Sequence, residues 1–151
     1  MANTQALCTS FKTEILSGIH AFGTTVIRAG TGADTLKAAL YLASATVNAA
    51  TTAYSATNEV SGTNYSAGGV TITNATAPTS SGTTAYWTPS ASFTYTNVTL
   101  STAFDAVLVY NSTQSNKSVS VHTFGSQTIT AGTFTLTMPT NDSTNALIRI
   151  A

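Results

Sequence analysis

Charged side chains are scarce in this sequence. Lysine and arginine together number five, aspartate and glutamate also number five, and charged residues are 7% of the 151 residues, whereas an ordinary soluble domain has about 25%. Five cations cannot neutralise many phosphates, which excludes a nucleic-acid binder that works through a basic patch. The same scarcity excludes a polybasic membrane anchor. The longest apolar run, residues 38–43, is far shorter than the roughly 20 residues of a membrane-spanning helix.

Cysteine is almost absent as well. Cys8 is the single cysteine, which excludes an intramolecular disulfide framework, and we expect it to be a small buried apolar residue. At the start of the chain, residues 1–5 contain no basic stretch followed by an apolar one. The sequence therefore predicts no secretion signal, and we expect synthesis in the cytoplasm of the producing cell.

Titratable residues are too scattered to predict catalysis or metal binding. No two of the five acidic residues lie at strand or helix spacing, and His20 and His122 are far apart in the sequence. Neither histidine has a cysteine or carboxylate partner at ligand spacing, so we expect no metal and no other cofactor. No serine has a recognisable base and orienting group. We therefore expect a protein that is not an enzyme.

Apolar residues recur at helical spacing near the N-terminus. The intervals between them are four, four, four and three, which predicts an amphipathic helix from Gln5 to Phe22 with one apolar stripe. Gly23 is the expected end of this helix. We interpret residues 1–23 as a helical arm whose stripe must lie on a sheet or on another subunit. The stripe consists of Leu7, Phe11, Ile15, Ile19 and Phe22.

After residue 23 the apolar residues alternate with threonine and serine, in short runs separated by Gly, Pro and Asn. This pattern predicts a mainly β fold, with residues 24–151 as one antiparallel β-sandwich or jelly-roll-like domain. Residues 44–62 have no clear period and are predicted to be a long connection, a kind of segment that often contacts something outside its domain. The predicted strands are 24–29, 35–42, 70–73, 92–100, 106–110, 118–122, 132–138 and 146–150.

The aromatic residues near the middle of the chain allow two interpretations. Tyr86 and Trp87, with Phe93 and Tyr95, could form a platform that stacks on sugars, as in a carbohydrate-binding adhesin. The simpler interpretation is that Trp87 packs in the core, because large aromatic side chains dominate the cores of small domains.

A domain with so few charges must cover its outside with neutral polar side chains; about a fifth of the residues are threonine and about a tenth are serine. A net charge of zero removes the repulsion that keeps small proteins apart and so promotes association. Hydroxyl and amide groups can bond to neighbours without the cost of desolvating charges. The composition thus favours a part of a permanent assembly.

Several blocks resemble a group of small virion proteins of tailed bacteriophages. They are Phe-Lys-Thr-Glu-Ile-Leu-Ser-Gly-Ile-His from Phe11, Asp-Thr-Leu-Lys-Ala-Ala-Leu-Tyr from Asp34, and Thr-Thr-Ala-Tyr-Ser-Ala-Thr-Asn-Glu-Val-Ser-Gly from Thr51. Ala-Val-Leu-Val-Tyr-Asn-Ser from Ala106 and Asn-Ala-Leu-Ile-Arg-Ile-Ala from Asn145 are of the same kind. The resemblance runs over nearly the whole chain, in order, and carries no catalytic residues.

This resemblance implies a head decoration, or cement, protein on the capsid surface of a virion, produced in the cytoplasm of a bacterial host. Its implied partners are the major capsid protein or other virion proteins, and its implied state is a homotrimer. Some members of such groups serve instead in the neck, tail or fibre. From the apolar stripe and the long connection, we expect the partner interface to include Phe11, Ile15, Ile19, Phe22, Tyr54 and Glu59.

Overall fold

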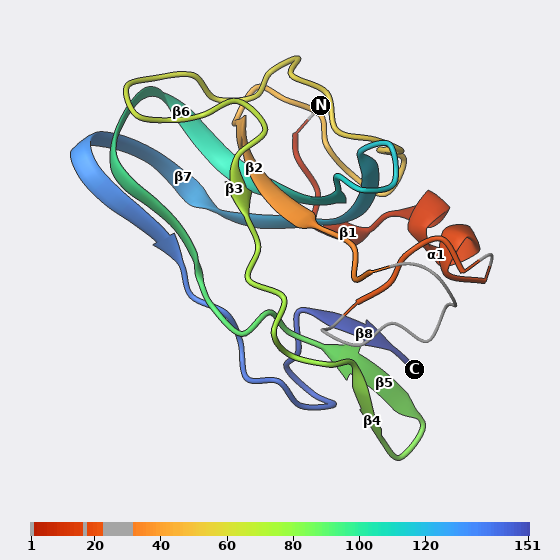
Figure 1. Ribbon diagram of the computed structural model, residues 1–151. Coiled ribbons are helices and arrows are strands. Elements are labelled where there is room, and N and C mark those ends of the chain that lie inside the picture. The colour runs from red at the N-terminus through yellow and green to blue at the C-terminus, as the bar shows by residue number, and fades with distance from the viewer. Residues whose placement is uncertain (1, 17, 23–31) are drawn as a thin grey trace.

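The computed structural model describes residues 2–16, 18–22 and 32–151 of the chain (Figure 1). Two antiparallel sheets contain most of its regular structure, with strand orders β1-β7-β6-β2-β3 and β4-β5-β8. The predicted mainly β fold, consistent with a sandwich, is therefore confirmed. The elements are β1 (Ala6–Leu7), α1 (Thr9–Leu16), β2 (Leu36–Leu42), β3 (Val70–Thr71), β4 (Thr79–Ser81), β5 (Thr84–Trp87), β6 (Phe93–Asn111), β7 (Lys117–Leu136) and β8 (Ile148–Ile150).

A long hairpin of β6 and β7 forms the backbone of the fold. Four of the predicted strands are in fact halves of these two continuous strands, so the prediction of separate strands at 92–100, 106–110, 118–122 and 132–138 is wrong. The hairpin is bent: one half lies in the five-stranded sheet beside β2, and the other half continues towards the three-stranded sheet (Figure 1).

The bend in this hairpin comes from paired β-bulges. From the pair Ala106–Thr123 to the pair Phe104–Gln127, β7 contains two residues more than β6. From Phe104–Gln127 to Leu100–Ile129, β6 contains two residues more than β7. Extra residues in a strand leave the ladder and increase its local twist, which bends the ribbon. Because the two insertions are equal, Leu100 and Ile129 pair in the original register. After a further shift at Val98 and Gly132, the same register holds from Tyr95 to Phe93.

The N-terminal helix is shorter than predicted. Gly18 has φ of 66°, its N–H donates to the Ile15 carbonyl at 3.0 Å, and the N–H of Ile19 donates to the Glu14 carbonyl at 3.0 Å. These two bonds form the Schellman motif that ends helices at a left-handed glycine. The predicted helix over 5–22 is therefore wrong at both ends: residues 6–7 form β1, which pairs with β7, and Ile19 and Phe22 follow the helix.

Some strand predictions differ from the structure in other ways. The predicted strand at 35–42 is found as β2, whereas those at 70–73 and 146–150 are shorter, as β3 and β8. Strands β4 and β5 were not predicted, because their threonine and serine residues lack an apolar alternation. The predicted strand at 24–29 lies outside the described residues.

One hydrophobic core joins the parts of the described chain. Cys8 and Phe11 are fully buried in it, together with residues of β2, β6 and β7. Cys8 is thus the buried apolar residue that the sequence predicted, and burial raises the pKa of its thiol to about 11. Because α1 packs against β7, the apolar stripe lies on a sheet of its own chain.

Candidate functional site

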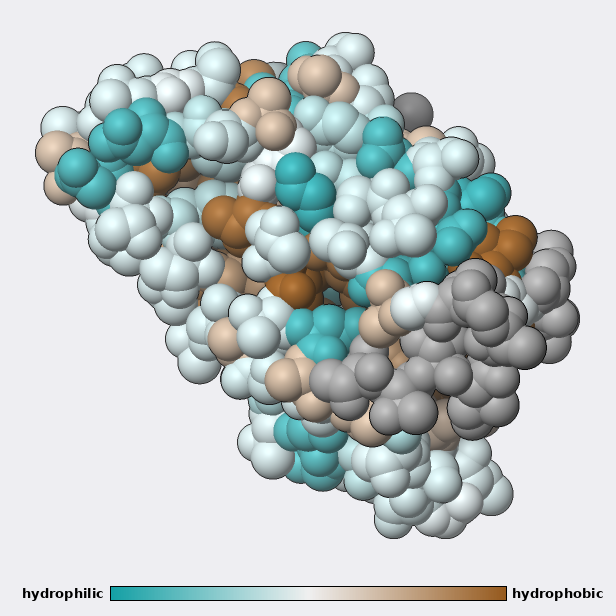
Figure 2. Space-filling view, in the orientation of Figure 1, coloured by the Kyte–Doolittle hydropathy of each residue, from teal (hydrophilic) through white to brown (hydrophobic). Residues whose placement is uncertain are grey.

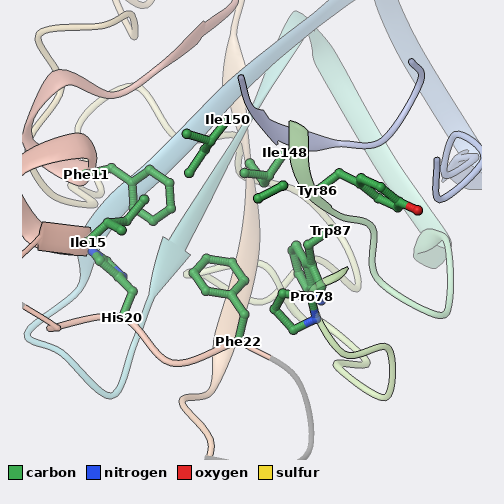
Figure 3. Close-up of a pocket in the computed structure, with 10 residues that line it drawn as sticks. Phe11, Ile15, His20, Phe22, Pro78, Tyr86, Trp87, Ile148 and Ile150 are labelled. Carbon is green, nitrogen blue, oxygen red and sulfur yellow. The ribbon is translucent and has the colours of Figure 1, made fainter. Parts of the chain in front are cut away.

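An apolar cavity of about 220 Å³ lies between the N-terminal segment and the three-stranded sheet (Figure 3). Phe11, Ile15 and Phe22 line one side of it, and residues of β5 and β8 line the other. At its rim is Ile150, which at 45% exposure is the one large apolar side chain exposed in the described part of the chain. This cavity brings together three of the residues predicted for a partner interface.

Aromatic rings make the wall of this cavity rigid. Phe22 lies edge-on between Phe11, at a ring-centre distance of 5.8 Å, and Trp87, at 4.8 Å, a geometry that aromatic pairs prefer. Trp87 is 2% exposed, and its indole N–H donates to the Thr76 carbonyl at 2.8 Å. Trp87 is therefore a core residue whose polar atom is satisfied.

The alternative of an exposed sugar-binding platform is not supported by this arrangement. Phe93 and Tyr95 are also buried, at 2% and 3% exposure. Tyr86 alternates with Trp87 along β5, and its ring points away from the cavity (Figure 3). The four aromatic residues therefore do not share an exposed face.

A hydrogen-bonded network holds the segment after α1 against the tip of the β6–β7 hairpin. The Glu14 carboxylate accepts a hydrogen bond from Lys117 Nζ at 2.6 Å and pairs with His20 Nε2 at 2.7 Å. On the other side of the His20 ring, Asn111 Nδ2 donates to His20 Nδ1 at 3.0 Å. The same amide also donates to Asp34 Oδ2 at 2.8 Å. Because His20 Nδ1 accepts, its proton lies on Nε2 and points at Glu14. Burial opposes ionisation of Glu14, but the bonds from Lys117 and His20 outweigh it and lower its pKa.

Both ring nitrogens of His20 are thus used inside the chain, and neither is available to a ligand. The network is a structural anchor that the sequence analysis missed. Its partners are up to 103 residues apart, so no local pattern could have revealed it.

A second polar cluster surrounds Glu59, which is 8% exposed. Its carboxylate accepts from the hydroxyls of Tyr54 at 2.6 Å and Tyr65 at 2.7 Å, and from the N–H of Gly68 at 2.7 Å. Tyr65 Oη also accepts from the Leu40 N–H of β2 at 3.0 Å. Burial and the Glu59 carboxylate raise the pKa of both tyrosines. These bonds fix the long connection onto β2.

The six predicted interface residues therefore fall in different places. Phe11 at 1% exposure and Glu59 at 8% are buried within the chain itself: Phe11 lies in the core cluster and Glu59 in the tyrosine cluster. Their contact with a partner stays a prediction. The remaining four are half-buried: Ile15, Ile19, Phe22 and Tyr54.

The other histidine, His122 in β7, hydrogen-bonds to Ser120 with 2.8 Å between Nε2 and Oγ. Burial lowers the pKa of His122 to about 4, so its ring is neutral at physiological pH. Ser120 is only 2% exposed, which leaves its hydroxyl little access to a substrate.

Fully exposed ionic groups are scarce among the side chains that the structure describes. Arg149 is the only exposed charged residue among those whose side chains the structure describes; the others are buried or half-buried: Glu14, Asp34, Lys37, Glu59, Asp105, Lys117 and Asp142. Figure 2 shows one face that is mostly pale, the colour of near-neutral hydropathy, with teal and brown confined to separate small areas. The pale colour fits an outside rich in threonine and serine, whose hydropathy is near neutral.

Within the described residues, no group of three or more His, Cys, Asp or Glu side chains is placed to hold a metal ion. Among those same residues, no helix is long and apolar enough to cross a membrane. No family model, curated protein or solved structure matches this chain.

Proposed function

We propose that this chain is a structural protein of a bacteriophage virion that decorates and stabilises the capsid by bridging subunits of the major capsid protein. The observation that carries the proposal is the scarcity of charge: charged residues are 7% of the chain, and among the side chains described Arg149 alone is fully exposed, while others such as Lys117, at 35% side-chain exposure, are partly so. The sequence blocks that resemble small virion proteins point in the same direction.

The physical reason is the cost of burying charge. A surface that docks permanently must lose its water, and desolvating an ion costs several kcal/mol unless it is well paired. Neutral hydroxyl and amide groups recover most of this loss through hydrogen bonds to the neighbour. A protein that stays free in solution gains nothing from such a surface, because charge keeps proteins apart.

This mechanism predicts attachment that does not depend on ion pairs. At 1 M ionic strength the Debye length is about 3 Å, so salt strongly weakens the attraction between charged groups. Apolar contacts and neutral hydrogen bonds stay largely intact. Capsids assembled without the chain would be mixed with the purified protein and washed in buffer of low salt or in about 1 M salt. We expect equal amounts to remain bound after both washes.

The position on the particle is tested by the copy number and by the density of the chain on intact virions. Hundreds of copies over the capsid lattice support decoration. A few dozen copies or fewer at one vertex would instead assign the chain to the neck, tail or fibre, and release by salt would contradict the proposed mode of attachment.

A further inference from the structure

The outer edge of β7 lacks a neighbouring strand over most of its length. Strand β1 pairs with it only at Ser120 and Val121, and no other described strand pairs with that edge as far as Leu136. In Figure 1 this part of β7 forms one outer side of the molecule, at the left of the view. The backbone N–H and C=O groups along such an edge are available for pairing with another chain.

This edge lacks charge, but register shifts interrupt its pairing with β6 between Thr123 and Gln127 and between Ile129 and Gly132, so the stretch suited to pairing is residues 132–136. Monomeric proteins protect edges with charged side chains, proline or bulges, yet residues 118–141 contain no Asp, Glu, Lys or Arg, and their only proline is Pro139. A residue with positive φ, Ala131, interrupts β7. Beyond it, β7 continues from Gly132 to Leu136 with no further residue of positive φ.

The side chains of this last stretch alternate in a way that suits an added strand. Phe134 and Leu136 are half-buried and pack against the core, with Phe134 at a ring-centre distance of 5.1 Å from Phe104. Thr133 and Thr135 are exposed on the other face. Threonine is a favourable strand residue, and threonine pairs across neighbouring strands are stabilising.

We propose that β7 pairs along this edge with β7 of a second copy of the chain, antiparallel about a two-fold axis, so that two sheets become one. A two-fold axis brings identical surfaces together, so a charged edge would meet its own charge and be repelled. An edge without charges avoids this penalty, and in an antiparallel pair of two copies threonine faces threonine on one side while Phe134 and Leu136 face their own kind on the other, so a second copy is the partner that we propose. The inference goes beyond the proposed function and does not rest on it.

The contact is small, because each copy contributes one strand. Stable interfaces usually bury about 1,200–2,000 Å² in total, and one pair of short strands lies at or below the lower limit. We therefore expect a dimer that dissociates in the micromolar range, measurable by sedimentation velocity from about 1 to about 100 μM.

Thr135→Lys and Thr135→Glu test the proposal, because each variant places like charges beside each other in a two-fold dimer. We expect either variant alone to dimerise at least about tenfold more weakly than the wild type, and an equimolar mixture of the two to recover dimers. Thr79→Lys is the matched control: it adds the same charge to an exposed residue of β4, the edge strand of the other sheet, and should dimerise like the wild type.

Hydrogen exchange of the wild type gives a second readout that needs no substitution. Backbone amides in 132–137 should gain protection as the protein concentration rises, while those of 79–81 should not. A wild type that is monomeric at about 100 μM would overturn the proposal. So would an oligomer that Thr135→Lys leaves intact, or protection that appears at β4 instead of β7.

Discussion

Replacing Tyr65 by phenylalanine removes one oxygen atom that makes two hydrogen bonds. The Tyr65 hydroxyl donates to the Glu59 carboxylate at 2.7 Å and accepts from the Leu40 N–H at 3.0 Å. A hydrogen bond to a charged group contributes about 1.5–3 kcal/mol, and a buried N–H left without a partner costs about 1–3 kcal/mol. Tyr65→Phe should therefore lower the free energy of unfolding by about 3–5 kcal/mol.

Tyr54→Phe is the matched comparison. The Tyr54 hydroxyl also donates to Glu59, at 2.6 Å, but among the described residues it accepts no backbone hydrogen bond. Because Tyr54 is half-exposed, losing its hydroxyl should lower the free energy of unfolding by only about 1–2 kcal/mol. The two variants thus differ mainly by the Leu40 N–H that Tyr65→Phe leaves unpaired.

The assay is equilibrium unfolding in urea, with the wild type and both variants fitted separately and their slopes compared. For a chain of this length, each kcal/mol should also lower the melting temperature by about 2–4 °C. Equal losses for the two variants would refute the assignment of a second bond to Tyr65. A loss below about 1 kcal/mol for Tyr65→Phe would refute the view that the cluster holds the connection on β2.

Three further predictions concern other parts of the molecule. Folding lowers the pKa of His122 from 6.5 to about 4, so between these two pH values the folded protein binds fewer protons than the unfolded chain. The free energy of unfolding should therefore fall by about 2–3 kcal/mol from pH 7 to pH 4.5. In urea unfolding, His122→Gln should lack this part of the decrease. Phe11→Ala should cost about 3–5 kcal/mol in urea unfolding because the ring is fully buried, whereas Ile150→Ala at the exposed rim should cost less than about 1 kcal/mol. Gly69→Ala should prevent folding, as judged by circular dichroism, because the added Cβ would lie 1.8 Å from the Ala38 carbonyl oxygen. Gly82 also has positive φ, but no atom lies near the place of its Cβ. Gly82→Ala should therefore lower the free energy of unfolding by only about 1–2 kcal/mol.

Much of the β-sheet could be predicted because its signal is local. The alternation of apolar residues with threonine predicted a mainly β fold, and β2 lies within one residue of the predicted 35–42. The single β6 strand could not be predicted as continuous. Its bend depends on extra residues in β7 as well as in β6, and a partner strand leaves no trace in a local pattern.

The helix end shows how a nearby signal can be misjudged. Both Gly18 and Gly23 are suitable helix ends, and the apolar spacing favoured the later one. The structure uses Gly18, whose left-handed backbone lets Ile19 bond back to Glu14.

The candidate site was only partly visible in the sequence. Helical spacing grouped Phe11 and Ile15 correctly, but it could not show that β5 and β8 complete the cavity around them. Contacts such as that between His20 and Asn111, 91 residues apart, depend on the tertiary fold. The burial of Glu59 could not be predicted from the sequence either, because its hydrogen-bond donors come close to it only when the connection folds back onto β2.

The matched bulges of the β6–β7 hairpin restrict how the length of this chain can change. A shift of one residue turns every later side chain in a strand to the opposite face. Deleting one residue between Thr123 and Gln127 alone would thus rotate Phe134 and Leu136 out of the core. A simultaneous deletion between Leu100 and Phe104 would keep them inside, so variants that lengthen or shorten the bend should gain or lose residues in both strands together.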